Sequence, residues 1–170
     1  KNALDCCNIS WVEKPGVEAD DVIATLSTRF VDEDETNYSY IASTDTDFLQ
    51  LLHERCKILK LLQGGKHSII DAHFVEEKYS INPGRYVELK SWVGDKADNI
   101  NGIPGIGWMR GAEILNGKRN RELTTEESII YERNLKLIRL NRQVDLVHNL
   151  SEPGRLYSCS NSDIFELCEF

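Results

Sequence analysis

The sequence lacks most of the features that mark membrane-spanning, disulfide-linked or zinc-binding proteins. It has no apolar run near the length of a membrane span and no N-terminal signal-peptide pattern. Its five cysteines are odd in number and never spaced as Cys-x-x-Cys, and its four histidines show no i, i+4 pairing. We therefore expect a soluble cytosolic chain with reduced cysteines and no membrane association.

An excess of basic residues is also missing: 20 Lys and Arg stand against 28 Asp and Glu, which gives a formal net charge of −8. That balance, taken alone, argues against nucleic-acid binding. The charges are unevenly distributed, however: residues 1–50 hold 11 acids against 3 Lys or Arg, whereas residues 110–142 hold 8 Lys or Arg against 5 acids. An acidic pocket followed by a modestly basic segment is compatible with a nuclease and equally with an ordinary acidic protein, so charge alone does not decide.

Hydrophobic periodicity predicts an α/β fold. A length of 170 residues with 41% hydrophobic content is enough for one compact domain, or for a domain with a helical appendage. The patterns predict strands at 9–13, 38–43, 57–62 and 67–70, and helices at 18–30, 48–52, 72–79, 84–93, 108–115 and 125–144. Strands and helices alternate in the first half and helices dominate the second, which indicates a sheet domain with a helical extension.

What the chain does have is seven carboxylates in three tight groups: Glu18, Asp20 and Asp21; Asp45 and Asp47; Asp95 and Asp98. Like charges packed together repel one another, and folding must offset that repulsion with cations or solvent. Clustered carboxylates supply the oxygen ligands that Mg²⁺ and Mn²⁺ prefer. Since ligands of open α/β sheets bind beyond the carboxyl ends of strands, Asp45 and Asp47, just after a predicted strand, are well placed to line a pocket.

Each group also has a purely structural reading. An Asp-x-Asp turn that caps the next helix is the favoured reading of Asp45 and Asp47 taken alone. Capping of a first helical turn explains one of the acids at 18–21 comfortably and three poorly. Turn chemistry accounts for Asp98 followed by Asn99, but it explains Asp95 less well, because acids are disfavoured at the end of a helix.

A glycine-rich turn, Gly102-Ile-Pro-Gly-Ile-Gly107, follows the third acidic group and opens a predicted helix. Its glycines permit positive φ and close approach to a ligand, and free N–H groups near Gly107 could hold a phosphate. As an isolated string it could equally be a tight connection between two helices. Metal-binding acids beside a phosphate-binding turn together indicate phosphodiester hydrolysis.

Taken in order, the motifs resemble those of the 5′-nuclease family, the bacterial and phage 5′→3′ exonucleases and flap endonucleases. The segments that carry the resemblance are Gly-Val-Glu-Ala-Asp-Asp-Val, Ser-Thr-Asp-Thr-Asp-Phe and Val-Gly-Asp-Lys-Ala-Asp-Asn-Ile-Asn-Gly-Ile-Pro-Gly-Ile-Gly, together with Pro83–Lys90. The resemblance covers roughly residues 10–145. It implies the C-terminal part of a PIN-like metal-binding α/β domain at 1–80, a helix-three-turn-helix DNA-binding domain at 81–150 and a tail of unknown role at 151–170.

The resemblance also implies a two-metal site for Mg²⁺ or Mn²⁺. Glu18, Asp20, Asp21 and Asp45 would hold the first ion, and Asp45, Asp47, Asp95 and Asp98 the second, with Asp21, Asp45 and Asp47 taken as catalytic. Such a pair of ions clamps the attacking and leaving oxygens of an in-line displacement.

The glycine turn of this family grips DNA. The implied DNA contacts here are Gly102, Gly105, Ile106, Gly107 and Arg110, and backbone carbonyls of Ile100, Ile103 and Ile106 would hold a K⁺ ion. The expected partner is DNA with a 5′ end, a flap or a single-strand/duplex junction, or an RNA–DNA hybrid. The expected state is a monomer in the cytoplasm of a bacterial or phage-infected cell.

Two departures from the family pattern shape the expectations. Met109 stands where the family usually has a lysine after the turn, and Arg110 replaces it only in part. Nothing before Ile9 resembles the family's first strand and basic arch, so the chain resembles the C-terminal part of such a nuclease. The alternatives are a DNA-binding part that does not cut, a PIN-type ribonuclease and a Mg²⁺ phosphohydrolase.

Overall fold

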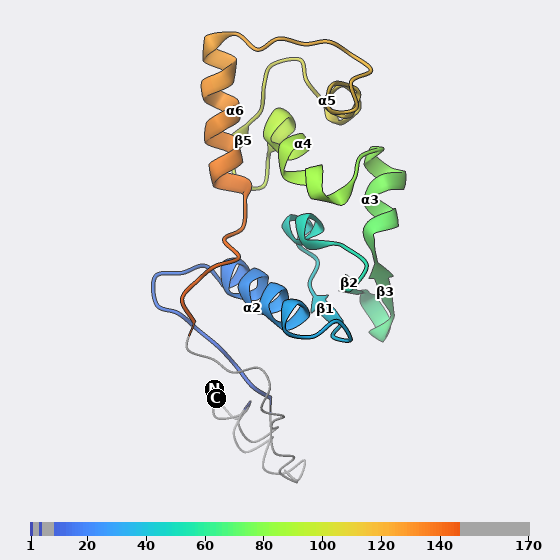
Figure 1. Ribbon diagram of the computed structural model, residues 1–170, viewed down its shortest axis with the longest axis vertical. Coiled ribbons are helices and arrows are strands. Elements are labelled where there is room, and N and C mark those ends of the chain that lie inside the picture. The colour runs from blue at the N-terminus through green and yellow to red at the C-terminus, as the bar shows by residue number, and fades with distance from the viewer. Residues whose placement is uncertain (2–3, 5–8, 147–170) are drawn as a thin grey trace.

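A three-stranded sheet forms one end of the molecule in the computed structural model, which describes residues 1, 4 and 9–146 (Figure 1). The strands are β1 (Ser39–Ala42), β2 (Cys56–Leu61) and β3 (His67–Ile70), in the spatial order β1-β2-β3. β1 runs parallel to β2, and β3 pairs with β2 in the antiparallel direction. A 3₁₀ turn, η2 (Gln63–Gly65), joins the antiparallel pair, and its two glycines have positive φ.

Helix α2 (Ala19–Glu33) lies beside β1 and precedes it in the chain (Figure 1). Its buried residues pack on two sides: Ala24 joins the main core, whereas Val22 packs with Val144 and Leu146 of the segment after α6 (Thr125–Ile138). The chain leaves β1 through a 3₁₀ helix, η1 (Thr46–Leu51), whose residues Phe48 and Leu49 enter the same core. The segment that carries Asp45 and Asp47 is therefore anchored by buried apolar side chains on its C-terminal side.

The second half of the molecule is helical and packs around α4. Its helices are α3 (Ala72–Tyr79), η3 (Pro83–Arg85), α4 (Tyr86–Val93), α5 (Trp108–Leu115) and α6 (Thr125–Ile138). Figure 1 shows α4 between α5 and α6, and Tyr86 and Leu89 of α4 are almost completely buried. Helix α6 starts with a capping box, in which Thr124 and Glu127 satisfy each other's backbone N–H groups.

A two-stranded ribbon of β4 (Gly94–Asp95) and β5 (Ile100–Asn101) connects α4 to the glycine turn. Its backbones approach so closely that a Cβ on Gly94, at φ 85°, would lie 2.4 Å from the amide nitrogen of Gly102. A Cβ on Gly102 would lie 2.2 Å from the carbonyl of Val93. Both glycines are therefore required by packing at this crossing.

The segment after α6 returns to α2 and joins the two halves. The Thr25 hydroxyl donates to the carbonyl of Asn141 and accepts from the N–H of Val144, both at 3.1 Å. The Arg29 guanidinium donates to the carbonyls of Val144 and Leu146, at 2.7 and 3.1 Å. The return segment is thus held mainly by side chains of α2.

The expected α/β architecture with a helical extension is confirmed, and several boundaries move. The strand expected at 9–13 is wrong, because these residues have no strand partner. The helix expected at 125–144 ends at Ile138, where the return segment begins. The tail at 151–170 lies outside the described residues. No helix among the described residues is long and apolar enough to cross a membrane.

Candidate metal centre

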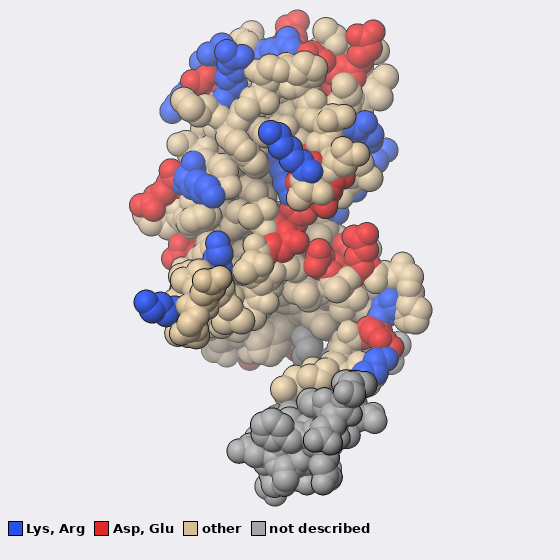
Figure 2. Space-filling model, turned by 180° about the vertical axis from the view of Figure 1, so that it is seen from behind, with Lys and Arg blue, Asp and Glu red and all other residues tan. Residues whose placement is uncertain are grey.

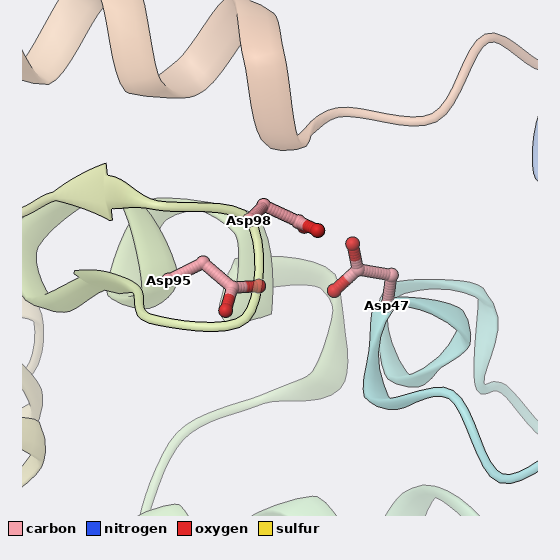
Figure 3. A group of neighbouring side chains, drawn as sticks. All are labelled: Asp47, Asp95 and Asp98. Atoms are coloured by element: carbon pink, nitrogen blue, oxygen red, sulfur yellow. The ribbon is translucent and has the colours of Figure 1, made fainter.

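Acidic side chains gather across the middle of one face, where the sheet half meets the helical half (Figure 2). Three of them, Asp47, Asp95 and Asp98, place one carboxylate oxygen each within 4.8 Å of one another. They come from η1 and from the β4–β5 ribbon, and their carboxylates point toward each other (Figure 3). We call these three residues the assembled cluster.

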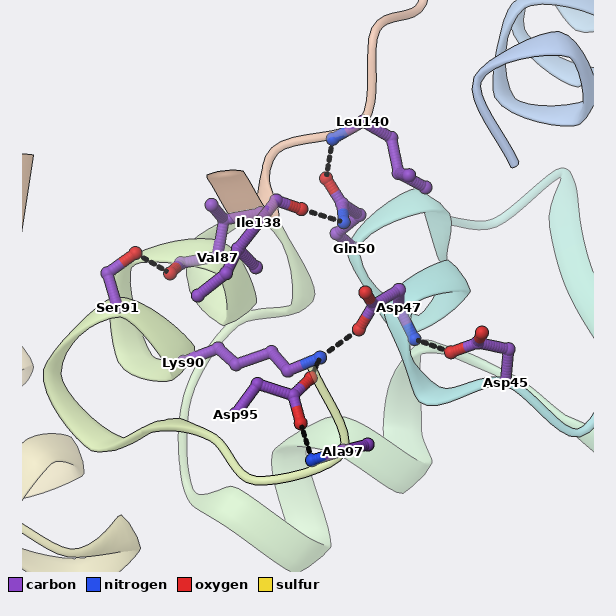
Figure 4. A network of polar contacts seen from close by, with 10 residues as sticks. All are labelled: Asp45, Asp47, Gln50, Val87, Lys90, Ser91, Asp95, Ala97, Ile138 and Leu140. Carbon is purple, nitrogen blue, oxygen red and sulfur yellow. Dashed lines mark hydrogen bonds and ion pairs between the residues drawn. The ribbon is translucent and has the colours of Figure 1, made fainter. Parts of the chain in front are cut away.

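A lysine from α4 penetrates the assembled cluster. The ammonium of Lys90 forms ion pairs with both Asp47 and Asp95 (Figure 4). The Lys90 side chain is only 4% exposed, so the bridge is made almost entirely out of contact with water. A buried charge is tolerated only when it is paired, and here one cation pairs with two carboxylates drawn from different elements and offsets one of their two negative charges.

The pKa values follow from burial and from this pairing. Burial would lower the pKa of Lys90, but its bonds to Asp47 and Asp95 raise it above the usual value. Burial raises the pKa of Asp47, and Lys90 only partly opposes that shift. Asp95 is pushed the other way: bonds from Lys90 and from the N–H of Ala97 outweigh burial and lower its pKa.

Asp45 lies beside the assembled cluster and serves as the N-cap of η1. Its carboxylate accepts from the N–H of Asp47 at 2.8 Å (Figure 4), and its own N–H donates to the Ser43 hydroxyl. Asp45 thereby orients the residue that enters the cluster. Asp45 therefore caps η1 and also lies beside the candidate metal ligands.

The first acidic group, Glu18, Asp20 and Asp21, lies at the start of α2, and we call it the helix-end cluster. Glu18 is the exposed N-cap and makes no side-chain capping bond. The Asp21 carboxylate accepts from the N–H of Asn141 at 2.8 Å. Burial raises the pKa of Asp20, and the negative charges of Asp45 and Asp47 raise it further, so the helix-end cluster lies close enough to feel the other acids.

The donor set fits a hard divalent cation. Three carboxylates converge at the assembled cluster, and Asp20 and Asp45 stand nearby, so oxygen ligands are available on several sides. Lys90 already supplies positive charge at Asp47 and Asp95, where an ion would compete with it. The crowding of acids and the buried cation among them both show that this region is organised around positive charge.

The glycine turn between β5 and α5 has an ordered geometry of its own. Its N–H at Ile106 donates to the carbonyl of Ile103 at 3.1 Å, and Ile103 donates in turn to the carbonyl of Trp92. The Arg110 guanidinium folds back onto the carbonyl of Gly105, at 2.8 Å. Gly107 has open space where a Cβ would lie. The exposed part of this turn therefore extends from Pro104 to Gly107, whereas Gly102 is packed against α4.

Three polar residues that position the centre escape motif-based reasoning. Besides Lys90, Gln50 links η1 to the end of α6 through the Ile138 carbonyl and the Leu140 N–H, both at 3.1 Å. Buried Asn134 donates to the carbonyls of Ser91 and Asn101, both at 3.0 Å. The sequence signal for Lys90 is only that of a charged residue in a largely apolar segment, Tyr86–Val93.

Comparison with known proteins gives a consistent result. Residues 1–80 match the family described as 5′-3′ exonuclease, N-terminal resolvase-like domain. A 5′-3′ exonuclease of Mycoplasmopsis pulmonis is 34% identical over 122 residues, which is 72% of this chain and 39% of that protein. The thermostable DNA polymerase I of Thermus filiformis is 38% identical over 115 residues, 68% of this chain and 13% of that protein.

Solved structures show the same fold. The T5 5′-exonuclease with bound divalent zinc ions superposes with a TM-score of 0.61 at 22% identity, covering 78% of this chain and 54% of that one. A T5 flap endonuclease pseudo-enzyme–product complex with DNA and metal ions gives a TM-score of 0.60 over 74% of this chain and 51% of that one.

The chain spans about two fifths of the length of the 5′-3′ exonucleases that it matches, and a smaller share of the DNA polymerases. Its acidic motifs, its PIN-like sheet and the matched segment at 1–80 agree with one another. The chain therefore belongs to the 5′-nuclease family, of whose fold it carries a part.

Proposed function

We propose that this protein acts as a divalent-metal-dependent 5′→3′ exonuclease or 5′-flap endonuclease that hydrolyses phosphodiester bonds of DNA. The observation that carries the proposal is the convergence of Asp47, Asp95 and Asp98 from two separate elements within 4.8 Å. Surface acids are common, but three that converge, two of them paired with a buried lysine, require the fold to bring them there.

Two ion sites are proposed. Asp45, Asp47, Asp95 and Asp98 would hold one ion, and Glu18, Asp20, Asp21 and Asp45 the other, with Mg²⁺ or Mn²⁺ as the ion. When bound, such ions generate hydroxide from water near neutral pH and offset negative charge on the departing oxygen.

Groups of the protein itself position the proposed metal ligands. Asp45 fixes Asp47 through the N-cap bond, and Ala97 fixes Asp95 through its N–H. Lys90 prevents Asp47 and Asp95 from repelling each other apart before a metal ion arrives. Asp47 and Asp95 would thus be held in place before a metal ion binds.

Substrate binding is assigned to the glycine turn. Gly105, Ile106 and Gly107 would present backbone to a DNA phosphate, with Gly102 shaping the turn, and Arg110 would add positive charge. Carbonyls of Ile100, Ile103 and Ile106 would hold K⁺ next to that phosphate. Within this scheme residues 1–80 are the C-terminal part of the PIN-like metal-binding domain, and residues 81–150 are the DNA-binding domain, which adds the ligands Asp95 and Asp98. Residues 151–170 have no assigned role.

The proposed substrate is DNA with a 5′ end, a flap or a single-strand/duplex junction, and RNA–DNA hybrids extend the same chemistry. Recognition would be of structure, because the proposed contacts are to the phosphate backbone. The protein would act as a monomer. Its DNA affinity should fall steeply with salt, since phosphate contacts release counterions.

The test is cleavage of a 5′-flap DNA labelled at its 5′ end, in K⁺ with Mg²⁺ or with EDTA. We expect metal-dependent release of the label, abolished in the double variant Asp45→Ala, Asp47→Ala, which should still bind the flap in EDTA. Glu54→Gln, an exposed acid outside both clusters, is the matched control and should cut normally. Equal cutting by the double variant would refute the metal assignment, and binding without cutting by the unmodified protein would leave only a DNA-gripping role.

A further inference from the structure

A pocket of about 250 Å³ lies between the end of α3 and the first turns of α5, outside the acidic centre. Its lining includes Tyr79, Trp108 and Met109, with Lys78 and Lys118. Trp108 is 38% exposed and Met109 81% exposed, so two large apolar side chains face solvent immediately after the glycine turn. Single exposed apolar residues need no explanation, but a pocket lined by two of them does.

The wall of the pocket is a rigid group of aromatic rings. The ring of Trp108 lies 4.9 Å from that of Tyr79 and 6.2 Å from that of Tyr86, almost parallel to the latter at 18°. Tyr86 is only 1% exposed and belongs to the main core. The indole of Trp108 is therefore held from behind by the core, and it presents a fixed aromatic surface rather than a mobile one.

The charged groups at the pocket favour an anionic ligand. The ammonium of Lys78 lies 5.1 Å from the ring centroids of Phe74 and Tyr79, which orients it. Glu113 also lines the pocket, but its carboxylate is bound by Arg119 at 2.9 Å. Within the described part of the chain, neither Lys78 nor Lys118 has an ion pair with a carboxylate.

We propose that this pocket binds an unstacked nucleobase of DNA, with its flat face against Trp108 and its flanking phosphates near Lys78 and Lys118. Fixed aromatic surfaces combined with lysines are the combination that single-stranded nucleic acids require. The inference rests on the proposed function, because it assumes that the neighbouring turn, Gly102–Gly107, holds DNA. The pocket would add an apolar contact with DNA to a protein whose net charge of −8 limits purely electrostatic binding.

The test measures binding in EDTA, where no cleavage occurs, with 5′-flap DNAs that carry 2-aminopurine at successive unpaired positions. We expect the protein to quench the 2-aminopurine fluorescence at one or two positions. Trp108→Ala should remove that quenching and weaken binding about tenfold, whereas Trp108→Phe should keep most of both. Tyr38→Ala, which removes an exposed ring on the loop before β1, is the control and should change neither.

Salt dependence separates the stacking contact from the lysines. Trp108→Ala should leave the slope of log Kd against log[salt] unchanged, because stacking releases no counterions. The double variant Lys78→Gln, Lys118→Gln should reduce that slope by about 1.4, since each single-strand phosphate contact contributes roughly 0.7. Circular dichroism of each variant verifies that it is folded.

The outcomes distinguish the two proposals. If a folded Trp108→Ala protein binds and quenches like the unmodified protein, the pocket does not hold a base and this inference is overturned, whereas the nuclease proposal would stand. If the unmodified protein binds no flap DNA at any salt concentration, both proposals are overturned.

Discussion

The two acidic clusters differ in how the fold deals with their charge. The assembled cluster is built from separate elements, and the buried ammonium of Lys90 pairs with two of its three carboxylates. The helix-end cluster lies along one helical turn, and the described residues supply it with no cation: Asp21 has only the N–H of Asn141, and the pKa of Asp20 is raised. Lys90 is thus a structural counterion for one cluster, whereas the other relies on solvent or on ions. Four changes test that difference, in descending order of expected effect.

Removing the internal cation should have the largest effect. Lys90→Met leaves Asp47 and Asp95 facing each other without compensation, and loss of one partner of a buried pair costs about 3–5 kcal/mol. We expect this loss in urea unfolding with EDTA, and partial recovery with Mg²⁺. Lys66→Met, an exposed lysine between β2 and β3, should change stability little. Equal stability of Lys90→Met and the unmodified protein in EDTA would mean that Lys90 is no counterion.

Metal binding should depend on the assembled cluster first. At a Mg²⁺ concentration 100 times its Kd, binding to the folded state alone raises the free energy of unfolding by about 2.7 kcal/mol. Asp98→Asn should abolish most of this gain, because it removes a charged oxygen ligand from the converging set. Glu18→Gln, at the exposed N-cap of α2, should retain most of it. Thermal unfolding with and without Mg²⁺ measures the stabilisation of each variant. A larger loss of stabilisation in Glu18→Gln than in Asp98→Asn would contradict the comparison.

Loosening the return segment should disturb the helix-end cluster selectively. Thr25→Val removes a buried hydroxyl that binds both Asn141 and Val144, at a cost of about 2 kcal/mol for the groups left unpaired. The Asp21–Asn141 bond should weaken with it, and amide exchange of the Asn141 N–H should accelerate. Thr28→Val on the same helix is the control. Unchanged exchange at Asn141 would show that the segment is held by other contacts.

The smallest effect concerns pH and Asp20. Because the folded state raises the pKa of Asp20 above its ordinary value of 3.8, the folded protein binds that proton more tightly than the unfolded chain. Stability contributed by this group is therefore present below that value and is lost as the pH rises through the raised pKa. Asp20→Asn should stabilise the metal-free protein at neutral pH, by less than about 1 kcal/mol. The gain should disappear in acid, and a gain that persists there would refute the assigned cause.

Local patterns predicted most of the helices and strands of this fold. The expected ranges 67–70, 72–79 and 108–115 coincide with β3, α3 and α5, because apolar periodicity and capping residues such as Asp71 are local signals. Two expectations failed where tertiary contacts override such signals. Residues 9–13 have strand-like composition without a neighbouring strand, and residues 139–144 leave the helix to bind Thr25 and Arg29.

The candidate site was only partly accessible from sequence. All seven acids were visible as motifs, but which of them meet depends on how the β4–β5 ribbon approaches η1, and no spacing rule gives that arrangement. Lys90 was visible only as part of a helix. Its pairing with Asp47, 43 positions earlier, is a property of the folded chain.

The return segment determines when the helix-end cluster can be fixed during synthesis. The N–H that binds Asp21 belongs to a residue 120 positions later, and the bonds of Thr25 and Arg29 also wait for residues of that segment. A chain emerging from the ribosome exposes its first acids long before these partners exist. The helix-end cluster is therefore fixed only after α6 has been made, so a growing or prematurely ended chain carries the acids without the bonds that hold them in place.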